Sequence, residues 1–208
     1  MQEYLKIPNI YERETFGKNR LIDGKFSSET LELLRNIQWR WTEKVDGTNI
    51  RVHWDGHRVE FAGRTDRAQI PKPLYDLLTE LFGGTNKEEI FEQTFNEKDV
   101  ILFGEGYGGR IQGAGPKYGE LRFILFDVTV NGKYLSRENV EGIAGVFGLD
   151  CVPEIGYGTL EDAVKIVKRR PKSLLGNIDM EGLVCRPMKE LQDENGRRVI
   201  CKIKARDF

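Results

Sequence analysis

The sequence predicts an α+β fold with mainly antiparallel sheets. Runs of alternating residues are joined by short turns, most clearly at Asp55-Gly56, where strands 50–54 and 57–63 form a predicted hairpin. Asn131-Gly132 marks a second hairpin turn. Apolar residues at helical spacing occur between these strands, as in 71–82. Strands of this kind with helices packed outside them indicate a layered α+β domain.

The first part of the chain has a weak pattern. Residues 1–26 contain the breakers Pro8, Gly17 and Gly24, and we predict no element there. Ser28 is an expected N-cap for a helix over 29–37, whose Leu31, Leu34 and Ile37 share one face.

The middle of the chain predicts two helices and a buried strand. Pro71 begins the first helix and Gly83 ends it. A shorter helix is predicted over 86–95. The apolar run 100–103 predicts a buried strand that ends at Gly104, where a glycine-rich stretch begins.

The last part alternates between strands and helices. Strand 121–128 precedes the Asn131-Gly132 turn, and Ser136 caps a helix that Gly148 ends. Another helix begins at Thr159, with acidic residues in its first turn and basic residues toward its end. Two more strands are predicted, one entered at Met180–Val184 and one over 199–205.

Composition excludes several classes of protein. The chain has 208 residues, 39% hydrophobic and 31% charged, and a net charge of −1, so any nucleic-acid surface must be a local patch. No apolar run approaches the roughly 20 residues of a membrane span. Three cysteines at unrelated spacings indicate reduced thiols. We therefore expect a soluble, cytoplasmic protein.

Lys44 stands two residues before Asp46-Gly47, between an aromatic-rich run and strand 50–54. Because Asp-Gly marks a tight bend, we expect Lys44 where the chain turns, with its ammonium facing a cavity. A surface lysine beside a hairpin turn explains this motif alone equally well.

Two glutamates and two lysines later in the chain add to this pattern. Glu105 follows the buried strand with glycine on either side, which would let a ligand approach the backbone closely. Glu181 stands at the start of a strand. Lys202 and Lys204 alternate with Ile203, so both should point to one face, where they repel each other unless an anion binds them.

The order of these motifs resembles the covalent nucleotidyltransferase superfamily of polynucleotide ligases and mRNA capping enzymes. The resemblance spans residues 44 to 204, and its motifs are Lys44-x-Asp46-Gly47, Arg64, Glu105, Phe126-Asp127, Glu181-Gly182 and Lys202-x-Lys204. It is closest to ATP-dependent RNA ligases of the phage RNA ligase 2 type, whose nucleophile motif continues as Gly-Thr-Asn, here Gly47-Thr48-Asn49. The family implies two sheets with helices outside them and an ATP pocket between the sheets.

The resemblance also implies roles for residues around the nucleotide. Lys44 would be the nucleophile that forms lysyl-AMP, and Glu43 would contact the adenine edge. Arg64 and Glu105 would hold the ribose and phosphate region. Phe126 would stack on adenine, with Phe123 in the same strand as a competing stacker.

The remaining motif residues concern the metal and the phosphates of ATP. Glu105 and Glu181 would serve Mg²⁺ or Mn²⁺, since their oxygens are hard ligands. Lys202 and Lys204 would hold the ATP phosphates, and Asn49 belongs to the nucleotide-binding set with its role open. A lysine amine with a pKa of about 10.4 is roughly 0.04% deprotonated at pH 7, so a lysine nucleophile needs cations nearby.

The implied activity is ATP-dependent joining of RNA ends that carry a 5′-phosphate and a 3′-OH. We expect a monomer in which 1–208 form a single nucleotidyltransferase domain, without an OB or C-terminal RNA-binding domain, because the chain ends four residues after Lys204. A phage origin is consistent with the resemblance. Whether the substrate is nicked duplex or single-stranded RNA stays open. The alternatives are an adenylation domain of a DNA ligase, a capping-type enzyme, and a non-catalytic nucleic-acid-binding module.

Overall fold

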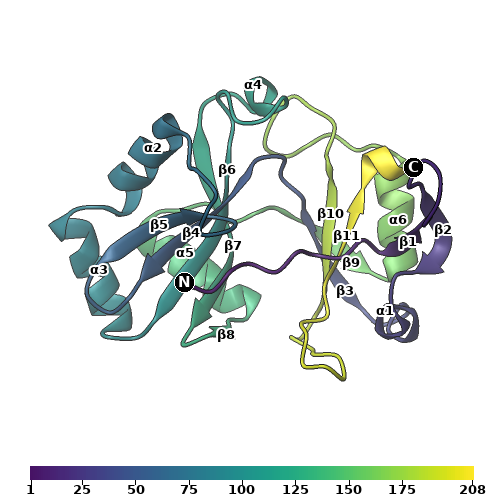
Figure 1. Ribbon diagram of the computed structural model, residues 1–208, viewed down its shortest axis with the longest axis horizontal. Helices are drawn as coiled ribbons and strands as arrows, with labels where there is room; N and C mark the ends of the chain where they lie inside the picture. The colour runs from purple at the N-terminus through teal and green to yellow at the C-terminus, as the bar shows by residue number, and fades with distance from the viewer. The chain divides into compact units, whose positions relative to one another are not determined.

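The chain divides into two compact units, each with its own sheet and its own hydrophobic core. Unit 1 comprises Met1–Leu5 and Asp46–Val152, and unit 2 comprises Lys6–Val45 and Pro153–Phe208. The computed structural model describes residues 1–208, and Figure 1 labels its elements.

Unit 1 contains a five-stranded antiparallel sheet in the order β5-β4-β6-β7-β8. The central β4 and β6 are long and apolar on one side, so they are buried between neighbouring strands and helices. The strands are β4 (Thr48–Trp54), β5 (Val59–Gly63), β6 (Val100–Tyr107), β7 (Arg122–Val130) and β8 (Lys133–Tyr134).

Three helices pack on one face of this sheet and complete the core of unit 1. They are α2 (Lys72–Phe82), α3 (Thr85–Phe95) and α5 (Arg137–Phe147); a short α4 (Gly115–Tyr118) follows β6. In α2, Leu74, Leu78 and Phe82 are fully buried at helical spacing, and each contributes about 1.5–3 kcal/mol of transfer free energy. This face of the sheet is therefore structural, and the opposite face carries the polar residues described below.

Unit 2 contains a four-stranded antiparallel sheet in the order β11-β10-β3-β9 and a separate two-stranded ribbon, β1-β2. The strands are β1 (Tyr11–Arg13), β2 (Leu21–Phe26), β3 (Trp39–Glu43), β9 (Glu154–Gly158), β10 (Gly182–Pro187) and β11 (Cys201–Lys204). The strand pairing places Trp41 opposite Cys185 and Cys185 opposite Cys201, and all three are buried in the core of this unit.

The helices of unit 2 cover that same core face of the sheet. They are α1 (Glu29–Leu33) and α6 (Leu160–Lys168), followed at the C-terminus by a 3-10 turn, η1 (Ala205–Asp207). The start of α6 is fixed by a capping box, in which Thr159 and Asp162 satisfy each other's backbone N–H groups. Because the helices occupy the core face, the alternate residues of β3, β10 and β11 are left on the other face.

Most predicted elements are confirmed, with shifts of a few residues at their ends. The hairpin at Asp55-Gly56 and the helices that begin after Ser28, Pro71 and Ser136 are present. Four strands had no prediction: β1 and β2 in the turn-rich start of the chain, β3 in the aromatic-rich run before Lys44, and β9.

One predicted strand end is wrong. The strand expected to end at Gly104 continues as β6 to Tyr107. Its glycines serve packing rather than a bend: a Cβ on Gly104 would lie 2.2 Å from the Phe123 ring, and one on Gly106 would lie 2.5 Å from Leu74. Large side chains from β7 and α2 therefore fill the space beside an unbroken strand.

The bend at Asp46-Gly47 also differs from a hairpin, because the strands before and after it, β3 and β4, belong to different sheets.

All three cysteines are free thiols, as predicted. None of the helices is both long enough and apolar enough to span a membrane.

Candidate functional site

Lys44 directly follows β3 in unit 2. Its backbone N–H donates to the carbonyl of Gly182 at 2.9 Å, so the pairing of β3 with β10 extends to the lysine. Its Nζ lies 2.6 Å from Oε2 of Glu181, and its side chain is 22% exposed. Lys44 is therefore held at the strand end by both its backbone and its ammonium.

Glu181 bridges two lysines. While Oε2 contacts Lys44, Oε1 lies 2.8 Å from Nζ of Lys204. The next residue, Gly182, makes this placement possible, since a Cβ there would lie 1.9 Å from the Ile203 carbonyl oxygen. Only glycine lets β11 approach this closely, and β11 then brings Lys204 to the carboxylate.

Lys202 and Lys204 lie on one face of β11, as predicted, because they pair with Val184 and Gly182 and alternate with the buried Ile203. The expectation that only a bound anion would offset their repulsion is wrong for Lys204, since Glu181 supplies the negative charge from within the chain. The backbone of Lys202 is also fixed, by hydrogen bonds with Pro8 and Ile10.

Glu43 points to the opposite face of β3 from Lys44. Its side chain is 1% exposed, and its carboxylate accepts hydrogen bonds from Ser173 Oγ at 2.5 Å and from the Leu174 N–H at 3.0 Å. Burial raises the pKa of this carboxyl, and the two hydrogen bonds oppose that rise. The adenine contact implied for Glu43 stays a prediction; to make it, this carboxylate would have to leave both partners.

Unit 1 brings together Asn49 and Glu105, which are directly opposite each other on β4 and β6. The side-chain oxygen of Asn49 is buried and has no hydrogen-bond partner. Gly47 lies against the same strand: a Cβ on it would lie 2.3 Å from the Gly106 carbonyl oxygen. The Gly-Thr-Asn stretch is thus packed on the strand that carries Glu105, with a polar atom available to a ligand.

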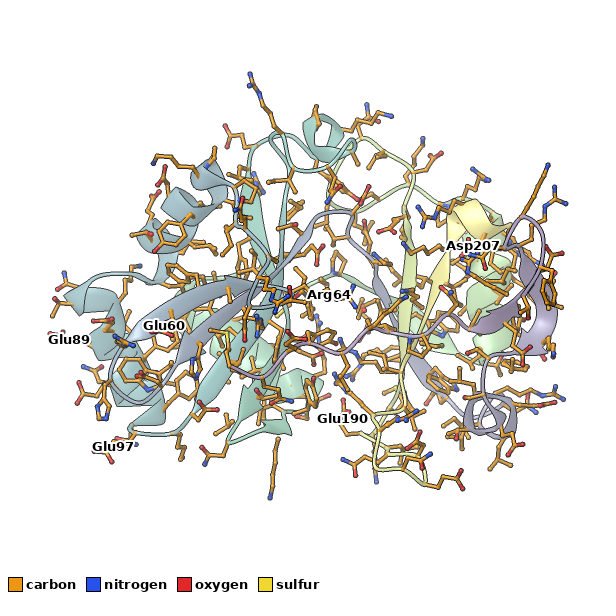
Figure 2. The ribbon with its side chains drawn as sticks, viewed as in Figure 1. Glu60, Arg64, Glu89, Glu97, Glu190 and Asp207 are labelled. Atoms are coloured by element: carbon orange, nitrogen blue, oxygen red, sulfur yellow. The ribbon has the colours of Figure 1, made fainter.

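Arg64 follows the last residue of β5 in unit 1. Figure 2 shows Glu60 and Arg64 toward opposite ends of this strand. The Arg64 side chain is exposed and makes no hydrogen bond or ion pair with the rest of the chain. The guanidinium is therefore available to an anionic ligand.

The two candidate adenine stackers have different environments. Phe123 is buried in the core of unit 1 and packs edge-on against Phe82 at a centroid distance of 5.4 Å. A bulge in β7, opposite Phe103 and Gly104, leaves Phe126 partly exposed. This difference in burial favours Phe126 over Phe123.

Tyr4, near the start of the chain, packs against Phe126 and bonds to the residue that follows it. The ring of Tyr4 contacts it edge-on at 5.1 Å, and Tyr4 Oη donates a 2.6 Å hydrogen bond to the buried carboxylate of Asp127. No motif in the sequence indicated that Tyr4 would lie here, because residues 1–26 have no readable periodicity.

The structure contains no group of three or more His, Cys, Asp and Glu side chains that could hold a metal ion. The carboxylates implied as metal ligands, Glu105 and Glu181, belong to different units. Glu181 offers two oxygens beside two ammoniums, and one carboxylate together with substrate phosphates is a common ligand set for Mg²⁺. The donor type therefore fits a divalent cation, but both oxygens are bonded to ammoniums, so a cation could bind at Glu181 only after one of these ion pairs opens.

Comparison with known protein families gave a match to the family described as RNA ligase over residues 37–204. No curated protein matched the sequence.

Solved structures of Naegleria gruberi RNA ligase have a similar fold. A mutant with ATP and Mn is 18% identical at a TM-score of 0.64, over 86% of this chain and 54% of that one. The enzyme with PPi is 20% identical at a TM-score of 0.62, over 84% and 51%. A second mutant with ATP and Mn is 18% identical at 0.64, over 96% and 59%. The chain thus spans about half the length of the structures it matches.

Proposed function

The chain belongs to the RNA ligase family, and we propose from this that it joins RNA ends in an ATP-dependent reaction through an intermediate on Lys44. The observation that carries the proposal is the lysine at the end of β3, whose Nζ lies beside Glu181, which in turn contacts Lys204. A neighbouring cation such as Lys204 favours the neutral, nucleophilic amine of a lysine, whereas the Glu181 carboxylate stabilises the ammonium of Lys44 until their ion pair opens.

The proposed reaction has three steps. Lys44 Nζ loses a proton and attacks the α-phosphorus of ATP, forming an N–P bond while the bond to pyrophosphate breaks. An oxygen of the RNA 5′-phosphate then attacks the same phosphorus, and Lys44 leaves. Finally a 3′-OH attacks the RNA 5′-phosphate and AMP leaves, so the new phosphodiester joins the two ends.

Unit 2 supplies the groups for the first step. The attacking amine cannot remain bonded to Glu181, so Lys44 must leave this carboxylate before it reacts. We propose that Lys202 and Lys204 bind the ATP phosphates and stabilise the charge that develops on pyrophosphate. A divalent cation held by Glu181, with Mg²⁺ or Mn²⁺ as candidates, would neutralise phosphate charge. The Naegleria structures with ATP and Mn support this choice of cofactors.

Unit 1 supplies groups that suit the nucleoside. Phe126 is the proposed adenine stacker because it is the accessible one of the two phenylalanines. Arg64 and Glu105 are assigned to the ribose and phosphate region. The unpartnered Asn49 oxygen can accept a hydrogen bond from the substrate. The adenine contact of Glu43, a residue of unit 2, stays a proposal that requires its carboxylate to leave Ser173 and Leu174.

The lysine pair gives a direct test of these roles. We expect Lys204→Ala to slow ATP-dependent labelling at least about tenfold, equal to about 1.4 kcal/mol of transition-state stabilisation. Lys202→Ala should do the same. Sealing of pre-adenylated RNA should be spared, since it bypasses the departure of pyrophosphate. Near-normal labelling together with a collapsed melting temperature would assign the lysines to structure instead.

The RNA preference can be tested with nicked duplexes that differ only in the sugar at the 3′-OH end. We expect sealing of a ribose end and much slower sealing of a deoxyribose end. Equal rates would favour a DNA ligase, and labelling by GTP in place of ATP would favour a capping enzyme. A Lys44→Ala variant that retains full function would favour the non-catalytic module.

We further propose that 1–208 act as one nucleotidyltransferase domain, as a monomer in the cytoplasm. A sedimentation experiment at working concentrations tests the monomer, and limited proteolysis tests whether the two units separate.

A further inference from the structure

Arg51 is a charged side chain buried within β4 of unit 1. It has no exposed surface, and a charge buried in this way is tolerated only when it is paired and hydrogen-bonded. Its guanidinium has four partners. Nε donates to the Gly63 carbonyl at 2.7 Å, Nη2 to Asp66 Oδ1 at 2.7 Å, and Nη1 to the carbonyls of Met1 and Gln2, both at 3.2 Å.

Two of these bonds bracket Arg64. Gly63 precedes it and Asp66 follows two residues later, so the guanidinium holds the backbone directly on one side of Arg64 and through the Asp66 carboxylate on the other. A tight turn follows directly, because Ala68 N–H donates to the Thr65 carbonyl at 3.1 Å and includes Asp66 in the turn.

Arg64 has no side-chain contact of its own to set its direction. The direction in which its Cα–Cβ bond leaves the strand end is therefore determined by the backbone around it, from Gly63 to Asp66. That backbone is tied to Arg51, and Arg51 is itself immobilised in the strand pairing opposite Ala62.

We propose that Arg51 is a positioning residue for nucleotide binding, which acts by holding the Gly63–Asp66 segment so that Arg64 is presented to the ribose and phosphates of ATP. The inference rests on the proposed function, because it assigns a purpose to the direction of Arg64. A purely structural role, attaching the first residues of the chain to the sheet, is the competing explanation of the same bonds.

Asp66→Asn is the preferred variant for the test. The Asp66 side chain is 67% exposed, so the substitution weakens the tie to Arg51 without opening the core. Arg51→Lys is the second variant: it keeps the charge and loses the fork that reaches several partners at once. Asp76→Asn is the matched control, since it removes an exposed carboxylate from another ion pair of unit 1, with Lys72 at 2.8 Å.

The readout is the covalent labelling of the full chain with radiolabelled ATP, analysed as KM for ATP and as the maximal rate, beside the melting temperature. For Asp66→Asn we expect KM to rise about fivefold with the maximal rate changed less than about twofold. Arg51→Lys should raise KM at least as much, and Asp76→Asn should change neither parameter.

The decisive comparison is made in an Arg64→Ala background. If Arg51 acts through Arg64, adding Asp66→Asn to Arg64→Ala should cause no further rise in KM. The inference would be overturned if the double variant raised KM by the full product of the two single-variant increases. A folded Asp66→Asn variant with the KM of the wild type would overturn it as well. Either result would leave the proposed function intact. A wild-type chain that takes up no label would refute the proposed function and this inference with it.

Discussion

Replacing Glu181 by glutamine removes the charge that two lysines share while keeping the size of the side chain. In the native structure the carboxylate lies 2.6 Å from Lys44 Nζ and 2.8 Å from Lys204 Nζ. Glutamine can accept a hydrogen bond from one lysine, but its amide presents N–H donors to the other. The variant therefore leaves two ammoniums close together without a neutralising charge.

The size of the effect follows from burial. The side chains of Glu181, Lys44 and Lys204 are 17%, 22% and 15% exposed, between a surface ion pair and a fully buried one. A surface pair contributes below about 1 kcal/mol and breaking a buried pair costs about 3–5 kcal/mol, so we expect a loss of about 1–2 kcal/mol. For a chain of this length that lowers the melting temperature by about 2–8 °C.

The rate of lysyl-AMP formation should fall by more than the loss of stability alone would cause. If Glu181 holds the divalent cation that neutralises phosphate charge, Glu181→Gln should slow lysyl-AMP formation more than about tenfold. The assay is the initial rate of labelling with radiolabelled ATP, measured well below the melting temperature of the variant. Glu190→Gln is the control, since Glu190 (labelled in Figure 2) lies in the same unit and the substitution removes the charge from its ion pair with Arg198; it should label at the normal rate. Normal labelling by a folded Glu181→Gln variant would show that this carboxylate serves only the packing of the lysines.

Three further predictions concern a close backbone approach, a buried hydrogen bond and a helix cap. Gly47→Ala should lower both the melting temperature and labelling, because its Cβ would lie 2.3 Å from the Gly106 carbonyl oxygen; a thermal scan with unchanged melting would contradict this. Tyr4→Phe removes only the hydrogen bond to the buried Asp127 carboxylate and should reduce the free energy of unfolding by about 1–3 kcal/mol, measured by urea titration. Hydrogen bonds in the native state lower the pKa of Asp162 to about 2, so the stability it contributes is complete above its ordinary pKa of 3.8 and is lost as the pH falls through about 2. Asp162→Asn should therefore lower the melting temperature at pH 6 and make no difference below pH 2. A difference in melting temperature that stays constant with pH would exclude this linkage.

The motifs could be predicted from the sequence because each is local. A lysine before Asp-Gly, a glutamate between glycines and two lysines separated by one residue are visible in a few letters, and strand alternation places Lys202 and Lys204 on one face. The ends of α5 could also be predicted, because Ser136 at its start and Gly148 at its end act on backbone groups within one helical turn.

What could not be predicted depends on contacts between distant parts of the chain. The ion pair of Lys44 with Glu181 joins residues 137 positions apart, and the contact of Glu43 with Ser173 joins residues 130 apart. The continuation of β6 through Gly104 depends on the volume of Phe123. In the local pattern these glycines read as a strand end, because nothing in it shows which side chains lie beside them.

The most direct test of the account is the chemical identity of the labelled residue. The full chain is incubated with radiolabelled ATP and Mg²⁺, denatured, and digested, and the AMP-bearing peptide is sequenced by mass spectrometry. The account predicts one AMP attached to Lys44, no label in Lys44→Ala, and transfer of the label to RNA that carries a 5′-phosphate. AMP on a different residue, or undiminished labelling of Lys44→Ala, would contradict it.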